Sequence, residues 1–358
     1  MQNYHQNMKS DVQSTLDALV SPTASISCTE AAQRISVINT NYLKMCAERA
    51  AGLTEGSEKD EDDPYHGTST PGVPGFFSNL WGIVIERVHN APVEEEAHND
   101  HITRLVGLVD RTKNNSQPEG SEWLIGDEKC GWKDLPLLGQ TIRDVYNEPI
   151  DTMTFESSAL LSSEGQTAVA GAVRLEPQHL SGEDSQLNTI RLAVARHRWL
   201  SLQSFISRLW RDCKCDSYAL YAVWALRSGL EDWPESPPAF GTRYSTFEES
   251  PAYLVLQVEA ATIWINNAAS LMYQCTKIWG PNGNPDWPKR AGAPGKGGRR
   301  WSGVDGYDRE HKRWKLWKDG LGEVIQWCDR EGQGQVEGWR VKDAAIRALD
   351  SMKAAEQQ

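Results

Sequence analysis

The chain has 358 residues, a formal net charge of −12 at neutral pH and 39% hydrophobic residues. A chain of this length can bury a large core, as one large helical domain or as two closely packed ones. The acidic charge disfavours general binding to nucleic acid or to anionic membranes, because phosphate recognition depends on clustered lysines and arginines.

The cysteines and the N-terminus predict a cytoplasmic protein. The seven cysteines are odd in number and scattered, which is typical of reduced thiols. Only Cys213 and Cys215 are close together, and they lack the second pair or nearby histidines that a zinc site needs. Met1 to Ser10 is polar, and no stretch approaches about 18 continuous apolar residues. We therefore expect no secretory leader and no membrane partner.

Helical periodicity dominates the first half of the chain. Ser27 and Glu30 form a candidate capping box for a helix that ends at Gly52. The acidic, Gly- and Pro-rich segment 55–75 predicts a flexible, solvated loop. Further elements are then predicted in chain order: helices over 76–88, 102–109 and 139–146, a turn at 132–136, and a loop with a helical turn over 156–184.

The helical signal is stronger from Asn188 onward. Helices are predicted around Trp199 to Leu209 and around Tyr221 to Ser228, followed by a Pro-rich connection. A second candidate capping box, Ser245 to Glu248, precedes a helix with an Ala-rich face that reaches Met272. The last predicted elements are a basic Gly/Pro loop over 280–306, a helix through Trp314 and Trp317, and a helix over 339–352.

No two-residue period bounded by hairpin signals is present, and no internal repeat is evident. The sequence therefore predicts an all-α fold, with a single large multi-helix domain over residues 1–358 and long irregular loops. The spacing 314, 317, 321, 324 and 328 predicts that Trp314 and Trp317 lie on one buried stripe of a helix.

Six short blocks of the sequence resemble, in order, recurring blocks of the fungal DUF3632 family. They are Leu80–Val84, Trp132–Pro136, Trp199–Phe205, Tyr221–Arg227, Ala260–Ile265 and Gly306–Glu310, the last continuing through Arg313–Trp314 to Trp317–Lys318. The resemblance covers residues 76–330 and implies a helical fold and a fungal source. The family is a domain of unknown function, so it offers no catalytic residues to transfer. Some members look like accessory proteins of secondary-metabolite clusters.

No complete metal or cofactor motif is present. His98 and His101 are spaced to share a metal, but no third ligand accompanies them, and a solvated helix start is the simpler interpretation. Asn99 and Asp100 match part of a terpene-cyclase metal motif, but Gly107 replaces its glutamate. The glycines around Lys296 lack the spacing of a phosphate-binding loop, and no dinucleotide fingerprint or G-x-S-x-G is found. We predict no metal and no cofactor.

The segment from Asp286 to Lys318 is basic, with ten Lys/Arg against four Asp/Glu. Its tryptophans alternate with these cations, an arrangement that holds an anionic ligand or single-stranded nucleic acid in other proteins. Because only this local patch is basic, an anchor for a carboxylate or phosphate is favoured over nucleic acid. The simpler alternative is a flexible basic loop beside a solvated helix face.

The chain has fifteen tryptophans, twelve of them from Trp199 onward, which indicates either an aromatic core or an apolar cavity. If a cavity is present, the expected substrate-binding residues are aromatic: Trp199, Phe205, Trp224, Trp264, Trp314 and Trp317. The expected catalytic hydrogen-bond donors are polar residues among them: Tyr218, Arg227, Asn266 and Tyr273. The alternative is that these aromatic residues form only core and that the polar ones face solvent.

The leading hypothesis is a cofactor-independent cyclase or isomerase, such as a pericyclase of fungal secondary metabolism, acting on an apolar polyene or terpenoid. Such an enzyme accelerates its reaction by orienting a flexible substrate and by donating a few hydrogen bonds. The alternative is a noncatalytic helical interaction or scaffold protein whose basic loop meets a partner. The sequence does not indicate an oligomeric state.

Overall fold

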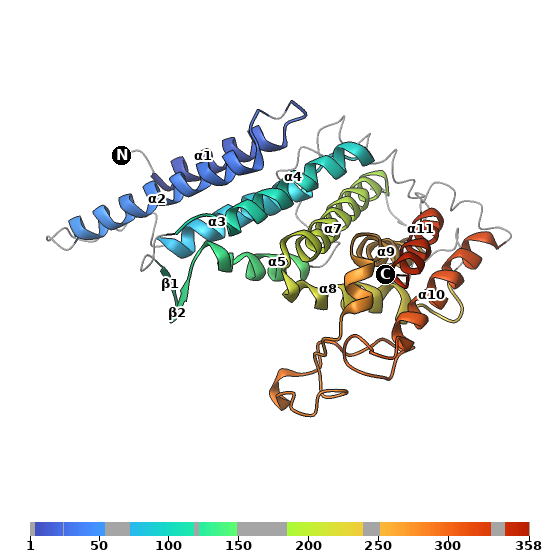
Figure 1. Cartoon of the computed structure of the whole chain (residues 1–358). Coiled ribbons are helices and arrows are strands. Elements are labelled where there is room, and N and C mark those ends of the chain that lie inside the picture. Colours follow the sequence, from blue (N-terminus) through green and yellow to red (C-terminus); the bar gives the residue numbers. More distant parts are fainter. Residues whose placement is uncertain are drawn as a thin grey trace. The chain divides into compact units, whose positions relative to one another are not determined.

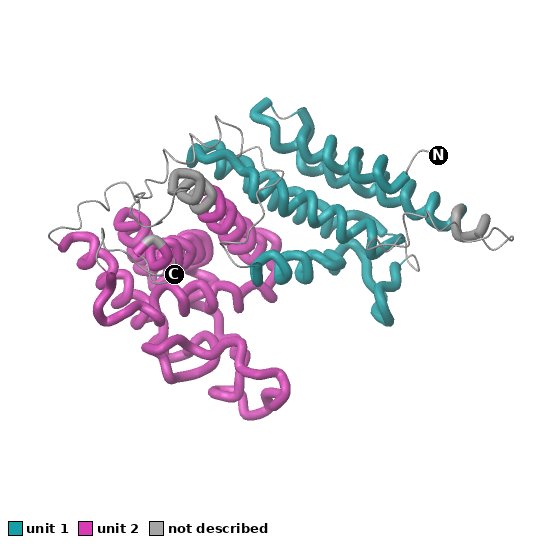
Figure 2. Tube along the Cα trace, turned by 180° about the vertical axis from the view of Figure 1, so that it is seen from behind, with its two compact units in different colours: residues 1–152 teal, residues 153–358 magenta. Residues whose placement is uncertain are grey.

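The computed structural model describes seven segments of the chain: residues 4–23, 25–53, 72–117, 122–148, 185–238, 251–330 and 341–357. They are predominantly helical, so the all-α prediction is confirmed (Figure 1). The chain divides into two compact units, Met1–Thr152 and Met153–Gln358 (Figure 2). The single domain over residues 1–358 therefore stays a prediction, and the two units are described separately.

Unit 1 contains five described α-helices: α1 (Tyr4–Val20), α2 (Cys28–Leu53), α3 (Val73–His89), α4 (Glu95–Lys113) and α5 (Leu138–Tyr146). Helix α1 packs against α2 and α3, and α2 packs against α4. The backbone N–H of Glu30 donates to Ser27 Oγ at 3.2 Å, as the capping box predicts at the start of α2. Helix α1 is an addition to the predicted elements, and α4 begins seven residues before the predicted helix.

Unit 1 also contains a short antiparallel hairpin that the sequence analysis did not predict. Strand β1 (Trp123–Ile125) pairs with β2 (Glu128–Cys130), and Gly126 at the turn has a φ of +61°. Three residues per strand are too few to establish a two-residue period, so the expectation of no strands is wrong here. The hairpin is nevertheless the only sheet within the described residues.

The hairpin and the turn after it complete an aromatic cluster. The ring of Trp132, in the 3₁₀ turn η1 (Trp132–Asp134), lies 5.0 Å from that of Trp123 and 5.3 Å from that of Phe77, centroid to centroid. Trp81 of α3 donates its indole N–H to the carbonyl of Pro136 at 2.6 Å. These contacts fix the turn over residues 132–136 against the core of unit 1.

Unit 2 contains the second set of helices, and α9 is their centre. They are α7 (Ser185–Cys213), η4 (Asp216–Tyr218), α8 (Ala219–Leu226), the π-helix η5 (Arg227–Glu231), α9 (Pro251–Gln274), η6 (Lys289–Ala291), α10 (Lys312–Asp329) and α11 (Val341–Ala355). Helix α9 packs against α7, α8, η5 and α11. Three predicted segments lie outside the described residues, wholly or largely: the acidic loop, the loop over 156–184 and the second capping box.

The stripe predicted on α10 is confirmed. Trp314 and Trp317 are 5% and 1% exposed, and Leu321 and Val324 are fully buried. The four residues recur at three- and four-residue steps, so they share the face that packs against α11 and η5. Helix α10 also carries Arg313, whose guanidinium forms several buried hydrogen bonds.

Candidate functional site

The π-helix η5 extends the end of α8 and directs Glu231 into unit 2. A π turn changes the direction of the side chains that follow it, and such turns are frequent at functional sites. The side chain of Glu231 is completely buried. Gly229 allows η5 to lie close to α9, because a Cβ there would be 2.5 Å from the carbonyl oxygen of Gln257.

Glu231 forms a buried ion pair with Arg313 of α10. Arg313 Nε donates to Glu231 Oε1 at 2.6 Å, and its Nη2 donates to Oε2 at 3.1 Å. The indole N–H of Trp317 and the backbone N–H of Gly298 also donate to the carboxylate, at 2.8 and 2.7 Å. The carboxylate thus accepts hydrogen bonds from three residues, which offset the cost of removing it from water.

Arg313 joins this ion pair to the loop over 280–306. Its Nη1 donates to the carbonyls of Gly295 and Gly306, at 3.1 and 2.7 Å. The guanidinium carbon lies 5.6 Å from the ring centroid of Trp301 and 5.7 Å from that of Trp317, which is within cation–π range. The side chain of Arg313 is only 1% exposed, so the loop and α10 share a buried, charged centre.

The base of the loop is closed by further hydrogen bonds. Ile278 and Gly306 form an antiparallel bridge, and the backbone N–H of Trp279 donates to the carbonyl of Asp305 at 2.7 Å. The buried carboxylate of Asp305 accepts from the backbone N–H of Asn282 at 3.0 Å. The two ends of the loop are therefore held side by side.

The middle of the loop is tied to α8 and η5. Trp224 donates its indole N–H to the carbonyl of Pro294 at 2.7 Å, and Arg227 Nη1 donates to the carbonyl of Lys296 at 3.3 Å. Gly295 is needed at its position, because a Cβ there would lie 2.3 Å from the carbonyl oxygen of Asp305. The backbone is irregular, yet it is fixed at its base and in its middle.

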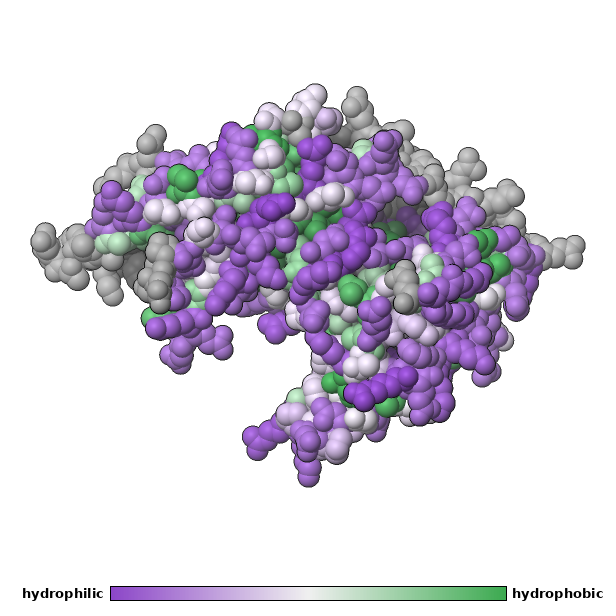
Figure 3. All heavy atoms as spheres, in the orientation of Figure 1, coloured by the Kyte–Doolittle hydropathy of each residue, from purple (hydrophilic) through white to green (hydrophobic). Residues whose placement is uncertain are grey.

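The loop carries five basic side chains, and two of them are paired. Arg299 donates to the carbonyl of Asp232 at 2.6 Å, and Arg300 donates to the carboxylate of Glu323 at 2.5 Å. The other three are exposed and form no ion pair within the described residues: Lys289, Arg290 and Lys296. In Figure 3 the loop, at the bottom of the view, is hydrophilic at its end.

Two of the four expected catalytic residues are aromatic. Tyr218 is 5% exposed and packs edge-on against Tyr221, and burial raises the pKa of its phenol well above the ordinary value. Tyr273 stacks on His311, with ring centroids 4.2 Å apart. The two tyrosines lie on different elements, η4 and α9.

The other two expected catalytic residues make contacts within the protein. Arg227 donates to the backbone of the basic loop, as described above, and Asn266 Oδ1 accepts from Ser351 Oγ of α11 at 3.1 Å. Within the described residues, no hydrogen bond or ring contact joins any two of the four residues. Their catalytic role stays a prediction.

The expected substrate-binding residues are largely core. Five of them are buried: Trp199, Phe205, Trp264, Trp314 and Trp317; the sixth, Trp224, is partly buried. Trp264 donates its indole N–H to Gln203 Oε1 at 2.7 Å, and Trp314 donates to Glu356 Oε1 at 2.8 Å. Trp314 and Trp317 lie together, with ring centroids 6.3 Å apart. A role for these residues in substrate binding stays a prediction.

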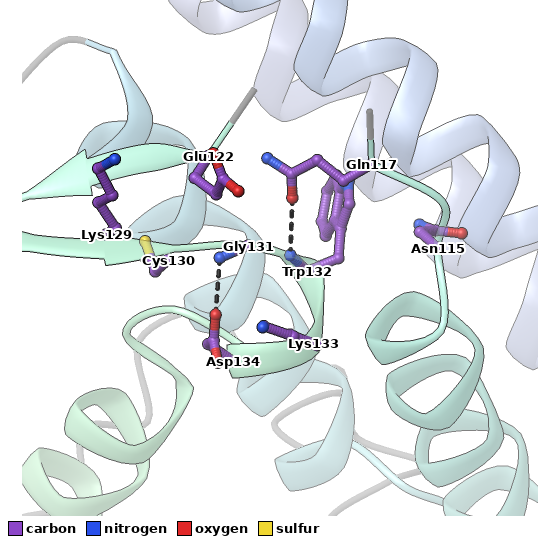
Figure 4. Close-up of a pocket in the computed structure, with 9 residues that line it drawn as sticks. All are labelled: Asn115, Gln117, Glu122, Lys129, Cys130, Gly131, Trp132, Lys133 and Asp134. Atoms are coloured by element: carbon purple, nitrogen blue, oxygen red, sulfur yellow. Dashed lines mark hydrogen bonds between the residues drawn. The ribbon is translucent and has the colours of Figure 1, made fainter. Parts of the chain in front are cut away.

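A pocket of about 490 Å³ lies in unit 1, where the sequence analysis placed no site (Figure 4). Its lining includes two amides, two carboxylates and two ammonium groups: Asn115, Gln117, Glu122, Asp134, Lys129 and Lys133. It also includes Cys130, whose thiol has a pKa raised by burial and by the nearby carboxylates of Asp134 and Glu128. Charged and amide side chains line this pocket beside apolar surface, whereas the sequence predicted an apolar cavity in the other half of the chain.

The floor of this pocket is held by two hydrogen bonds. Asp134 Oδ2 accepts from the backbone N–H of Gly131 at 2.8 Å, and Gln117 Oε1 accepts from that of Trp132 at 3.1 Å. Leu135 and Leu137, on either side of the proline that binds Trp81, have φ values of +46° and +64°. Left-handed backbone is costly for leucine, so tertiary contacts must impose it here.

The histidine cluster does not assemble into a metal site. His101 is buried, its Nε2 lies 2.9 Å from the carbonyl of Arg87, and burial lowers its pKa. Within the described parts of the chain, no three His, Cys, Asp or Glu side chains are grouped to hold a metal ion. The absence of a metal requirement stays a prediction. In the same parts of the chain, no helix is long and apolar enough to span a membrane.

A family model described as a protein of unknown function (DUF3632) matches residues 81–321. The match covers more than half of the chain, so the protein belongs to this family, as the six sequence blocks indicated. It includes the Glu231–Arg313 pair, the basic loop and the pocket of unit 1. No curated protein and no solved structure matches the chain.

The residues on which both sites depend give no clear signal in the sequence. Glu231 follows a helix and precedes a Pro-rich connection. The residues around it therefore do not distinguish it from a glutamate that is exposed to solvent. Arg313 belongs to a block that resembles the family, but its partner is 82 residues away. The pocket depends on Gly131 and on the hairpin, and neither gives a strong sequence signal.

Proposed function

We propose that the protein is a noncatalytic helical interaction protein that presents its basic loop, residues 280–306, to an acidic segment of a partner protein. The observation that carries the proposal is the buried Glu231–Arg313 pair. This pair holds an irregular loop in place, while three cations of the loop stay exposed and unpaired within the described residues. The cyclase or isomerase expected from the sequence remains a separate hypothesis.

The energetic cost of burying the Glu231–Arg313 pair supports a functional role for the basic loop. A buried ion pair seldom stabilises a fold more than apolar residues of similar size would, so its value lies in fixing geometry. Loops longer than about 15 residues are uncommon inside compact domains unless they are functional or disordered. A long loop that is hydrogen-bonded to a rigid helical support is a typical binding element.

The charge of the loop favours a short acidic partner. The whole chain is acidic, with a net charge of −12, so an extended polyanion would be repelled outside the loop. Binding to nucleic acid gains affinity with each phosphate that a protein cation neutralises, and three exposed cations add little affinity in this way. A segment with a few carboxylates matches Lys289, Arg290 and Lys296 in number and sign.

The proposal is tested by calorimetric titration of the full-length protein with an octa-glutamate peptide. We expect binding that weakens steeply with salt, and at least a tenfold loss of affinity in the variant Lys289→Glu/Arg290→Glu/Lys296→Glu. The matched control, Lys44→Glu/Arg347→Glu/Lys353→Glu, changes the charge equally at exposed residues outside the loop.

Two outcomes would overturn this proposal. One is an affinity for octa-glutamate that falls equally in the control variant, because the effect would then be one of net charge. The other is tighter binding of a single-stranded thymidine oligonucleotide than of the peptide. The cyclase hypothesis has its own assay, in which a linear polyene precursor is incubated in metal-free and nucleotide-free buffer. Under the present proposal, rate and isomer ratio equal those of the uncatalysed reaction.

A further inference from the structure

The pocket of unit 1 combines opposite charges that do not neutralise one another. Lys129 of β2 and Lys133 of η1 provide two ammonium groups, and Glu122 and Asp134 provide two carboxylates. Within the described residues, none of these four side chains forms an ion pair at 4.0 Å or less. Oppositely charged groups around one space, held apart, leave room for a ligand that carries both charges.

The charged groups come from different walls of the pocket. Figure 4 shows Lys129 on the hairpin, Glu122 before it and Lys133 with Asp134 on the turn below. Asn115, on the opposite side, adds an amide whose Nδ2 donates to the carbonyl of Ala32 at 3.2 Å. A ligand between these walls would meet donors and acceptors in several directions.

The backbone around the pocket is fixed before any ligand binds. The 2.8 Å bond from the backbone N–H of Gly131 sets the position of the Asp134 carboxylate. A Cβ at Gly131 would lie 2.6 Å from Gln117 Oε1, so only glycine permits this close approach without a shift of the glutamine. The left-handed leucines at 135 and 137 show that the turn is constrained. Constrained backbone of this kind is concentrated at ligand-binding and switch regions, and preorganisation lowers the entropy cost of binding.

We propose that this pocket binds a small zwitterion, a molecule of amino-acid or dipeptide type with a separate ammonium and carboxylate. Its carboxylate would pair with Lys129 and its ammonium with Glu122, which lie beside each other in Figure 4, each through charge-assisted hydrogen bonds. A volume of about 490 Å³ lies within the range of small-molecule sites. The net charge of the four lining groups is zero, which favours a ligand of zero net charge over a simple anion or cation. This inference is independent of the function proposed for the basic loop.

The test uses full-length protein and saturation-transfer NMR, followed by calorimetry on the compounds that bind. The probes are the twenty free L-amino acids and glycylglycine. Each bound probe is compared with its N-acetylated form, which lacks the ammonium, and with its amide, which lacks the carboxylate. We expect at least one zwitterion to bind, and both modified forms to bind at least tenfold more weakly.

Two variants keep the interpretation specific. Lys129→Met and Glu122→Gln each remove one charge at an exposed residue that makes no described hydrogen bond through its side chain, so the fold should be unaffected. We expect each to weaken binding at least tenfold, whereas Lys315→Met and Glu235→Gln, at exposed residues of unit 2, leave it unchanged. The proposal is overturned if no zwitterion binds, if an N-acetylated or amidated form binds as tightly as its parent, or if the pocket variants bind like the controls.

Discussion

At the scale of single residues, the centre of unit 2 depends on the charge of one carboxylate. Replacing Glu231 with Gln keeps the size of the side chain but leaves the guanidinium of Arg313 buried without a counter-charge. We expect the free energy of unfolding to fall by about 3–5 kcal/mol, the usual cost of breaking a buried ion pair on one side. Chemical denaturation monitored by circular dichroism measures this change.

The matched control for this substitution is Glu235→Gln, at an exposed position four residues later. Replacing a solvated carboxylate of this kind should change the free energy of unfolding by no more than about 0.5 kcal/mol. If Glu231→Gln has an equally small effect, the carboxylate does not hold the loop as described. The double variant Glu231→Gln/Arg313→Met should lose less than the sum of the two single variants, because the two residues are directly coupled.

The sequence identified only those residues whose buried neighbours lie close to them along the chain. The burial of Trp314 and Trp317 follows from a helical period, so a single segment contained all the information required. Glu231 and Arg313 meet only because η5 and α10 pack together, and this packing is not encoded in the neighbourhood of either residue. The buried charges of the site were therefore invisible, while the aromatic residues beside them were found.

At the scale of elements, α10 and the chain after α11 are joined by Glu356. Trp314 Nε1 donates to its carboxylate at 2.8 Å, and Lys318 Nζ donates to both oxygens, at 2.7 and 3.0 Å. The ammonium of Lys318, and secondarily the indole of Trp314, lower the pKa of Glu356 below its ordinary value of 4.5. This contact stabilises the folded state only while the carboxylate is ionised.

The sign of the pH dependence follows from this lowered pKa. The folded state favours the ionised carboxylate, so its stabilising contribution is complete above pH 4.5 and is lost as the pH falls through the lower pKa of the folded state. We expect Glu356→Gln to lower the melting temperature at pH 7, and expect the difference from the unmodified protein to shrink below pH 4.5. Asp350→Asn, which alters an exposed i,i+3 pair with Lys353, is the control. A difference that stays constant from pH 7 downward would contradict the assignment.

Among the elements, the sequence located those with a long and regular apolar period. Helices α3 and α11 were predicted within a few residues of their observed bounds. Helix α1 was missed although Met8, Val12, Leu16 and Leu19 are buried at helical spacing, because the segment as a whole is polar. The hairpin was missed because its strands are too short to show a two-residue period. Packing of Trp123 against Phe77 and Trp132 holds the strands, and the β-propensity of their residues contributes less.

At the scale of the whole molecule, the family match extends over parts of both units. It begins within α3 and ends within α10, so α1, α2 and α11 lie outside it. The helical class was predictable because nearly every long segment has a helical period. The division into two units was not predictable. The apolar pattern of a helix indicates that one of its faces is buried, but it does not indicate which other helices cover that face.

Dependence on a metal ion is a property of the whole protein. Among the residues that the structure describes, neither His98 with His101 nor Cys213 with Cys215 completes a ligand set. We therefore expect prolonged dialysis against a chelator to leave the melting temperature and helical content unchanged. Elemental analysis of the purified protein should find neither zinc nor iron in a stoichiometric amount. A loss of structure in chelator that is reversed by added metal would contradict this expectation.

The anchoring of the basic loop has a consequence for how its length can vary in evolution. Between residues 294 and 306 the backbone supplies the carbonyls that solvate Arg313, and inserting or deleting one residue displaces them by about 3.3 Å. Between residues 283 and 292 the hydrogen bonds are local, such as that from the indole of Trp287 to the carbonyl of Gly292 at 2.7 Å. Insertions and deletions among members of the family should therefore be concentrated in the tip of the loop, where partner preference can diverge without disturbing the fold.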